Sequence, residues 1–341
     1  MAVSALVVAF MHQPHIPHKP SHFTRDQMTA PGMFIVAHRG GAMEGWDNSF
    51  SAIKHAHEVG VHGIHVDIRR TNDGVYVLHH EDSLWRTTGQ ERHISESTYE
   101  EIGHYQDHID NGFGETYHHE NTEKEKPPKF EEVLHFFTDT DEVIFISDHT
   151  DHWKHTFEIL TMIKNHGLMN RVVFHTTQNW DQIRSKFGHS ISSWSGHENM
   201  EWTYEHFFNG DFFDHPEKFH WDVFHTTWNF HTIQQSPWFE HENDFVFSED
   251  HEFKDFVHGL EERKTSVQLM NHTFRQHGIP VTYWAANHEK DWHWAMEIGA
   301  HAIFTDKPAE AWLFKHNWTS SNWQGWNHWQ SHWQNHHWGH W

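Results

Sequence analysis

The chain has 341 residues, a formal charge of −24 at pH 7 with its 43 histidines counted as neutral, and no cysteine. The length suits one large domain with extensions, and the missing cysteines exclude disulfides and thiol chemistry. The acidic balance, with no cluster of lysine or arginine, argues against nucleic acid as a partner, because phosphate contacts need grouped positive charge.

Residues 1–31 are predicted to form an N-terminal extension or linker. The first ten, MAVSALVVAF, are apolar but too few to cross a bilayer, which takes about 20 residues. They also lack the basic start of a typical signal peptide, and residues 11–31 are rich in His and Pro. The sequence therefore predicts no transmembrane helix and no clear signal peptide, and leaves a soluble and a peripheral membrane location both open.

Short apolar runs alternate with helical patterns from residue 32 to residue 316. Two helical stretches, residues 48–60 and 155–167, each end on a glycine suited to a helix C-cap. This alternation predicts an α/β fold, a TIM (β/α)8 barrel, although a doubly wound open sheet would give a similar pattern. The strands are expected at residues 33–38, 63–68, 143–147, 171–175, 190–194, 244–248, 280–285 and 301–305.

One extended run departs from the alternation. GIHVDIRR is followed by TNDG and then by VYVLHHE. An Asp-Gly turn between two extended runs is a strong hairpin signal. Residues 75–80 are therefore expected to run antiparallel to the preceding strand, as an excursion at the barrel mouth.

Two polar segments stand outside the barrel pattern. Residues 89–128 are rich in His and Glu and are predicted to be a small insertion at the mouth. Residues 317–341 repeat Trp and His without a helical or strand period and are predicted to be a disordered tail. A membrane-interface anchor and a transition-metal chelator remain alternatives for that tail.

The predicted strand ends carry most of the reactive side chains. In a parallel barrel, functional residues lie at the carboxyl ends of the strands. Imidazole suits proton transfer because its usual pKa is about 6.5. In chain order these ends present His38, Arg39, His65, Asp67, His80, Glu81, Ser147, Asp148, His149, His175, Trp284, Asn287, Thr305 and Asp306.

At these residues the sequence resembles the glycerophosphodiester phosphodiesterase family. The ordered run AHRGG, WDNSF, HVDIRR and HHEDSLWRTTG is similar to the family's opening segment. KFEEVLHFF, GIPVTYWAAN and EIGAHAIFTDKP resemble its middle and closing segments. The resemblance spans residues 33–312, is weakest between 176 and 262, and looks closest to the eukaryotic lysophospholipase D-like branch. It implies a TIM barrel with a small insertion.

The resemblance also implies an activity. It assigns His38 and His80 as an acid–base pair, and Arg39 as a phosphate-binding residue. Trp284 matches a family aromatic near the substrate, and His149 stands where the family has a lysine. The expected reaction is metal-dependent hydrolysis of glycerophosphodiesters or lysophospholipids, which yields an alcohol and glycerol phosphate or lysophosphatidic acid.

The metal ligands depart from the family pattern. The family binds one divalent ion, Mg²⁺ or Ca²⁺, with a Glu-x-Asp pair that here reads His65 and Asp67. Its third acid falls at Ser147, with Asp148 one residue away. We expect His65, Asp67 and Asp148 as ligands, the last only if a bulge turns it inward. Imidazole in place of a carboxylate favours Mn²⁺ or Zn²⁺.

Two alternatives follow from these departures. One is a catalytically weakened or inactive barrel that binds phosphodiesters or transition metals without turnover. The other is a histidine-rich metal-buffering protein in which the barrel is only a carrier.

Overall fold

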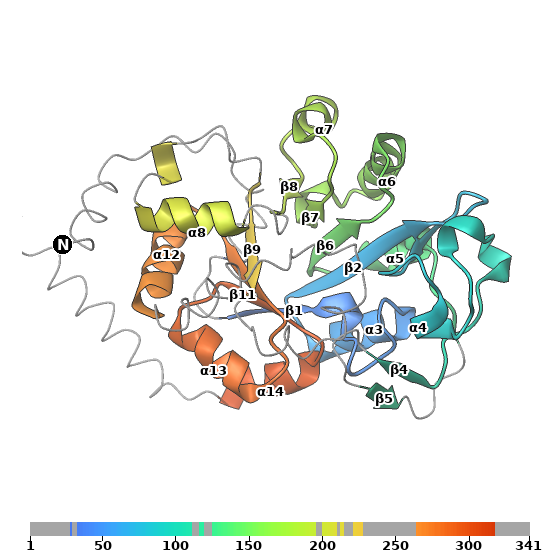
Figure 1. Ribbon diagram of the computed structural model, residues 1–341, viewed down its shortest axis with the longest axis horizontal. Helices are drawn as coiled ribbons and strands as arrows, with labels where there is room; N and C mark the ends of the chain where they lie inside the picture. The colour runs from blue at the N-terminus through green and yellow to red at the C-terminus, as the bar shows by residue number, and fades with distance from the viewer. Residues whose placement is uncertain are drawn as a thin grey trace, which may run out of the picture.

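The computed structural model describes residues 28, 33–110, 116–118, 125–195, 200–209, 212–214, 221–227 and 264–317. Eight parallel strands curl around a common core in the order β8–β7–β6–β2–β1–β11–β10–β9 (Figure 1). Their bounds are β1 (Phe34–Ala37), β2 (Gly63–Arg70), β6 (Val143–Asp148), β7 (Val172–His175), β8 (Ser192–Ser193), β9 (Phe224–Thr227), β10 (Val281–Trp284) and β11 (Ala302–Thr305).

The two ends of this sheet meet and close the barrel. Trp194, just after β8, forms a parallel bridge with Val223, just before β9. A buried ion pair of 2.6 Å between Arg184 and Asp222 lies at the same seam. The predicted barrel is thus confirmed and the open sheet excluded. The predicted strand at residues 244–248 lies outside the described residues. The set of eight parallel strands is completed by β9, at Phe224–Thr227, instead.

Strand alternation divides the core into two layers. Phe34, Phe145 and Phe304 point into the barrel, where buried Met28 also packs. The intervening residues, such as Ile35 and Ile303, face the surrounding helices. This follows from the period of two along a strand, and it fixes which strand-end residues face the mouth.

Helices connect the strands and cover the outer layer. The two helical stretches expected before glycines are α3 and α6, and Gly60 and Gly167 adopt the predicted left-handed conformation after them. The longer helices are α3 (Phe50–Val59), α5 (Phe130–Phe137), α6 (Trp153–Asn165), α7 (Trp180–Phe187), α8 (Met200–Asn209), α12 (Lys264–Gln276), α13 (Glu289–Glu297) and α14 (Pro308–Asn317).

The hairpin and the insertion lie at one side of the barrel. β3 (Tyr76–Leu78) pairs antiparallel with β2, as predicted. The following segment contains α4 (Trp85–Thr88) and the antiparallel pair β4 (His108–Asp110) and β5 (Thr116–His118). Figure 1 shows this segment beyond β2, on the opposite side of the molecule from α8 and α12. Three short 3-10 turns also lie in this half of the chain. η1 (His38–Gly40) follows β1, whereas η2 (Ile94–Glu96) and η3 (Tyr99–Glu101) belong to the insertion.

The outer segments remain predictions. Of the predicted extension, residues 1–31, the structure describes only Met28, and of the predicted tail only Asn317. Among the helices of the described part of the chain, none is long and apolar enough to cross a membrane.

Candidate active site

The chain turns sharply where β1 ends. His38 and Arg39 follow the strand in η1, and Arg39 has a φ of 51°. Gly40 and Gly41 continue with φ values of 82° and 103°. A Cβ atom at Gly41 would lie 2.8 Å from Pro308. The two glycines therefore serve a tight left-handed turn packed on α14, and this turn places His38 and Arg39 at the mouth.

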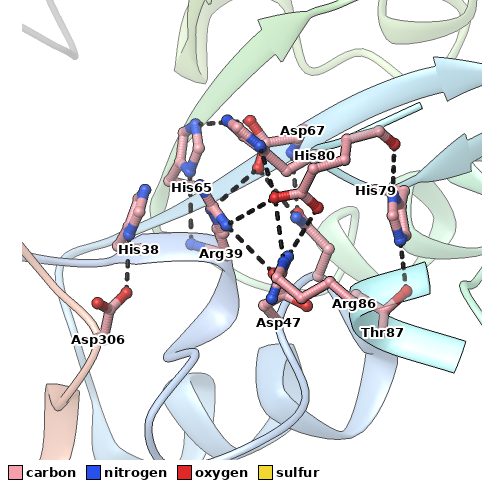
Figure 2. Close-up of polar contacts among 12 residues, drawn as sticks. His38, Arg39, Asp47, His65, Asp67, His79, His80, Arg86, Thr87 and Asp306 are labelled. Atoms are coloured by element: carbon pink, nitrogen blue, oxygen red, sulfur yellow. Dashed lines mark hydrogen bonds and ion pairs between the residues drawn. The ribbon is translucent and has the colours of Figure 1, made fainter. Parts of the chain in front are cut away.

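A buried carboxylate orients His38. Its Nδ1 lies 2.7 Å from Oδ1 of Asp306, which is fully buried after β11. The side chain of Asn287 donates to the other oxygen of Asp306 at 2.7 Å and accepts from its backbone N–H at 2.8 Å. An imidazole whose Nδ1–H is donated to a carboxylate presents Nε2 as its basic atom. Figure 2 shows this pair at one side of the site.

Arg39 lies among three carboxylates. Its guanidinium is 3.3 Å from Asp47, 3.7 Å from Asp67 and 3.9 Å from Glu81, and the residue is only 4% exposed. Arg86, from α4, contacts Asp47 and lies 2.8 Å from Glu81 (Figure 2). The five side chains form a buried network of two positive and three negative groups.

Positively charged neighbours keep Asp47 and Glu81 ionised. Burial, the largest single cause, acts to raise the pKa values of Asp47 and Glu81, but Arg86 and Arg39, joined at Glu81 by His80, together outweigh it. The pKa of Asp47 is lowered from its usual value, and that of Glu81 lies well below it. The network is therefore charged at neutral pH.

Asp67 stands at the centre of the strand-end residues. Asn48 donates to its Oδ2 at 2.9 Å and accepts from its backbone N–H at 2.9 Å. Its Oδ1 lies 3.0 Å from Nε2 of His149 and 3.6 Å from Nε2 of His65. Burial acts to raise the pKa of Asp67, but the imidazoles of His65, His80 and His149 outweigh it and hold that pKa well below its usual value.

The two histidines of the hairpin face opposite ways, as the alternation predicts. His79 lies 2.6 Å from the carbonyl of Glu81 and 2.7 Å from the hydroxyl of Thr87, on the insertion side. The ring of His80 packs 5.1 Å from that of His149, and its Nδ1 lies 3.2 Å from the carboxylate of Glu81. Burial, with the charge of Arg39, lowers the pKa of His80 to about 4.

Asp148 faces away from this group, which corrects its expected ligand position. β6 pairs regularly with β2, opposing Asp67 to Ser147, so no bulge turns Asp148 inward. Its carboxylate accepts hydrogen bonds from Thr150 and from Thr156 of α6. Ser147 faces the barrel instead and lies 3.0 Å from Nε2 of His65.

Trp284 lies on the side of the mouth away from the hairpin. Its ring is 6.4 Å from that of His38 and is stacked 6.2 Å from that of His225. It is partly buried and packs against the inner-layer cluster, of which Phe304 is a member. The position is compatible with the substrate contact expected from sequence, which stays a prediction.

The donor set fits a divalent metal of intermediate hardness. Asp67, His80 and His149 each bring one ligand atom, and these atoms lie within 4.8 Å of one another. One carboxylate and two imidazoles suit Zn²⁺, Mn²⁺ or Fe²⁺ better than Mg²⁺ or Ca²⁺, which favour oxygen ligands. Bound there, such an ion would polarise a phosphoryl oxygen.

Sequence reasoning left three members of the site without a role. Glu81 is one of the polar strand-end residues in the sequence, and Asp47 lies in the WDNSF run of the family resemblance, but neither was assigned a role. Arg86 gave no signal, because its place depends on how α4 folds back over the hairpin.

Comparison with known proteins points to one family. Residues 38–205 match the model of the glycerophosphoryl diester phosphodiesterase family. Glycerophosphodiester phosphodiesterase 1 of Rattus norvegicus is 36% identical over 78 residues, which are 23% of this chain and 22% of that protein. Lysophospholipase D GDPD1 of Homo sapiens is 31% identical over 105 residues, 31% of this chain and 33% of that protein. The matches thus span about a fifth to a third of these relatives.

Solved structures share the fold. A glycerophosphodiester phosphodiesterase from Thermotoga maritima superimposes with a TM-score of 0.53 at 19% identity, over 81% of this chain and 96% of that one. A glycerophosphoryl diester phosphodiesterase domain from Mycobacterium tuberculosis gives a TM-score of 0.55 at 17% identity, over 84% and 100%. The α/β barrel described above is therefore the architecture of these structures.

Proposed function

Because the chain belongs to the glycerophosphodiester phosphodiesterase family, we propose that it hydrolyses glycerophosphodiesters or lysophospholipids. The products are an alcohol and glycerol phosphate or lysophosphatidic acid. The lysophospholipid substrates rest on the similarity to lysophospholipase D relatives. The observation that carries the proposal is the His38–Asp306 pair, buried beside Arg39 and Asp67 at the mouth of the barrel.

We place the first proton transfer on His38. As the attacking oxygen of water or a substrate hydroxyl bonds to phosphorus, its proton passes to Nε2 of His38. The bond between phosphorus and the leaving oxygen breaks, and that oxygen then takes up a proton. The predicted second carrier is His80, whose contact with Glu81 suits either a proton carrier or a metal ligand.

Arg39 supplies positive charge for the phosphate. A guanidinium group matches phosphate oxygens in shape and keeps its charge at all relevant pH values. Its three carboxylate neighbours fix its position, and substrate oxygens would have to share the guanidinium with them. Trp284 and His149 are proposed to contact the substrate or the phosphate from either side. A peripheral membrane contact would bring lysophospholipids to the mouth and is part of the proposal only for those substrates.

A choline-release assay tests the function. The full chain is incubated with glycerophosphocholine or lysophosphatidylcholine in EDTA, Mg²⁺, Ca²⁺, Mn²⁺ or Zn²⁺. We expect metal-dependent choline release, abolished in the double variant His38→Ala/His80→Ala. A folded protein that releases no choline under any of these conditions would contradict the proposal for these substrates.

A binding barrel without turnover is the second candidate. The replacement of two family acids by His65 and Ser147 favours it. It predicts that glycerophosphocholine binds without product formation, and that His65→Glu combined with Ser147→Glu restores part of the turnover. Calorimetric binding measured beside the choline assay separates the two functions.

Asp306 is expected to act by positioning His38. In Asp306→Asn the amide can donate to Nδ1, which favours the imidazole tautomer with its proton on Nε2. We expect kcat to fall roughly 10²-fold, the lower end of general acid–base effects, with little change in KM. Asp306→Glu should recover part of the loss, and Asp291→Asn, another buried carboxylate at the start of α13, should leave kcat unchanged. An equal loss in both Asn variants would show a merely structural role.

A further inference from the structure

We propose that the site binds a transition-metal ion such as Zn²⁺ or Mn²⁺ through Asp67, His80 and His149, and that His65 is not a ligand. This set differs from the one expected from sequence, since it shares only Asp67 with it. The catalytic use of the ion rests on the proposed hydrolysis, whereas its binding can be measured without any substrate.

His65 is already engaged at both ring nitrogens. The backbone N–H of Arg39 donates to its Nδ1 at 3.4 Å. A neutral imidazole then carries its proton on Nε2, which lies 3.0 Å from the hydroxyl of Ser147. The two residues at the positions of the lost acids therefore hydrogen-bond each other. A protonated Nε2 cannot coordinate a metal.

Asp67 is fixed with one oxygen turned to the other two ligands. Asn48 donates to Oδ2, and Nε of Arg39 lies 3.7 Å from the same oxygen. Oδ1 is the oxygen that faces Nε2 of His149 at 3.0 Å. A metal ion at this point would replace the proton that His149 now shares with Asp67.

His80 is oriented for coordination by its neighbours. Its Nδ1 lies 3.2 Å from Glu81, and a histidine that donates to a carboxylate presents Nε2 as the ligand atom. Glu81 is held in turn by Arg86 at 2.8 Å. This is the carboxylate–histidine arrangement that commonly supports metal-binding imidazoles.

The ligand types decide the class of metal. Two imidazoles and one carboxylate suit ions of intermediate hardness, whereas Ca²⁺ and Mg²⁺ prefer sets of oxygen ligands. Since a coordinated Nε2 cannot also carry a proton, His80 would then not serve as the second proton carrier beside His38. His38 then returns the proton to the leaving oxygen itself.

Cobalt titration of the full chain tests the proposal. Co²⁺ replaces Zn²⁺ in such sites and reports nitrogen ligation by its visible absorption, and a competing chelator suppresses weak binding by the other histidines. The variants are His80→Ala, His149→Ala and Asp67→Asn. His65→Gln is the matched control, since it removes a histidine at the same strand end. Folding of each variant is checked by circular dichroism.

The expected result is one tight Co²⁺ equivalent in the wild-type chain, undisturbed by millimolar Mg²⁺. Its affinity should fall by more than about 100-fold in each ligand variant, beyond the loss typical of outer-shell changes, and should persist in His65→Gln. The proposal would be overturned if tight Co²⁺ binding were lost in His65→Gln, or if it were retained in folded His80→Ala and His149→Ala. It would also be overturned if the wild-type chain bound no tight Co²⁺ equivalent. Choline release is scored separately, so an inactive protein with this binding pattern contradicts only the proposed function.

Discussion

Replacement of His38 by glutamine is expected to lower kcat by about 10²- to 10⁴-fold, the range for loss of a general acid–base group. The amide of glutamine can still donate to Asp306, so the buried carboxylate keeps a partner. What is lost is the basic Nε2 that accepts the proton of the attacking oxygen. Steady-state kinetics with glycerophosphocholine, at the preferred metal ion, measure the effect.

The matched control is His135→Gln, an exposed histidine on α5. It should leave kcat and KM unchanged. His38→Ala should lose the same activity but also some stability, because Asp306 then remains buried without this partner. A His38→Gln variant that keeps more than a tenth of the wild-type kcat would rule out proton transfer by His38.

Replacement of Arg86 by methionine is expected to lower the free energy of unfolding by about 3–5 kcal/mol at pH 7. Arg86 is largely buried and contacts both Asp47 and Glu81. Without it, two buried carboxylates share only the more distant Arg39. Urea unfolding of the wild type and the variant gives the difference.

The pH dependence of that loss has a definite sign. In the wild type, Asp47 and Glu81 have pKa values below their ordinary values of 3.8 and 4.5. Their pairing therefore contributes stability above those values, and the contribution is lost as the pH falls through the lower folded values. In Arg86→Met we expect burial to dominate and to raise the pKa values of Asp47 and Glu81. Protonation of these carboxylates then removes the free-energy cost of burying their negative charges in the variant. The difference in the free energy of unfolding between the wild type and Arg86→Met should therefore become smaller as the pH falls from 7 to 5.

Arg92→Met is the control for a surface ion pair in the same insertion. Arg92 is 53% exposed and lies 3.2 Å from Glu101. Its loss should cost no more than about 1 kcal/mol. Equal losses of unfolding free energy in Arg86→Met and Arg92→Met would contradict the charge network as described. So would a difference between the wild type and Arg86→Met that grows as the pH falls.

Local patterns in the sequence were enough for much of the fold. Alternating strands and helices identified the barrel, the Asp-Gly turn identified the β2–β3 hairpin, and glycines marked the ends of α3 and α6. These features depend on short-range preferences that each segment carries with it. The strand β9 was missed because FHTT is short and polar, and its burial comes from neighbours rather than from its own composition.

The candidate active site also divides into features that local sequence predicts and features that only the tertiary structure decides. The residue types at strand ends, and the order in which they occur, place His38, Arg39, Asp67 and His149 at one mouth, because parallel strands end on the same side of a barrel. His80 reaches the same mouth through the predicted antiparallel hairpin. Sequence alone could also state that Asp148 needs a bulge to face inward. Only the strand register shows that no bulge exists.

Tertiary structure decided the partners that set the chemistry. Asp306 lies 268 residues from His38, and Ser147 lies 82 residues from His65. The meeting of Arg86 with Asp47 and Glu81 depends on the way α4 packs over the hairpin. Residue types and strand periods are local properties and can be read along the chain. Which nitrogen carries a proton, and which carboxylate keeps its charge, depend on contacts that exist only once the barrel has closed.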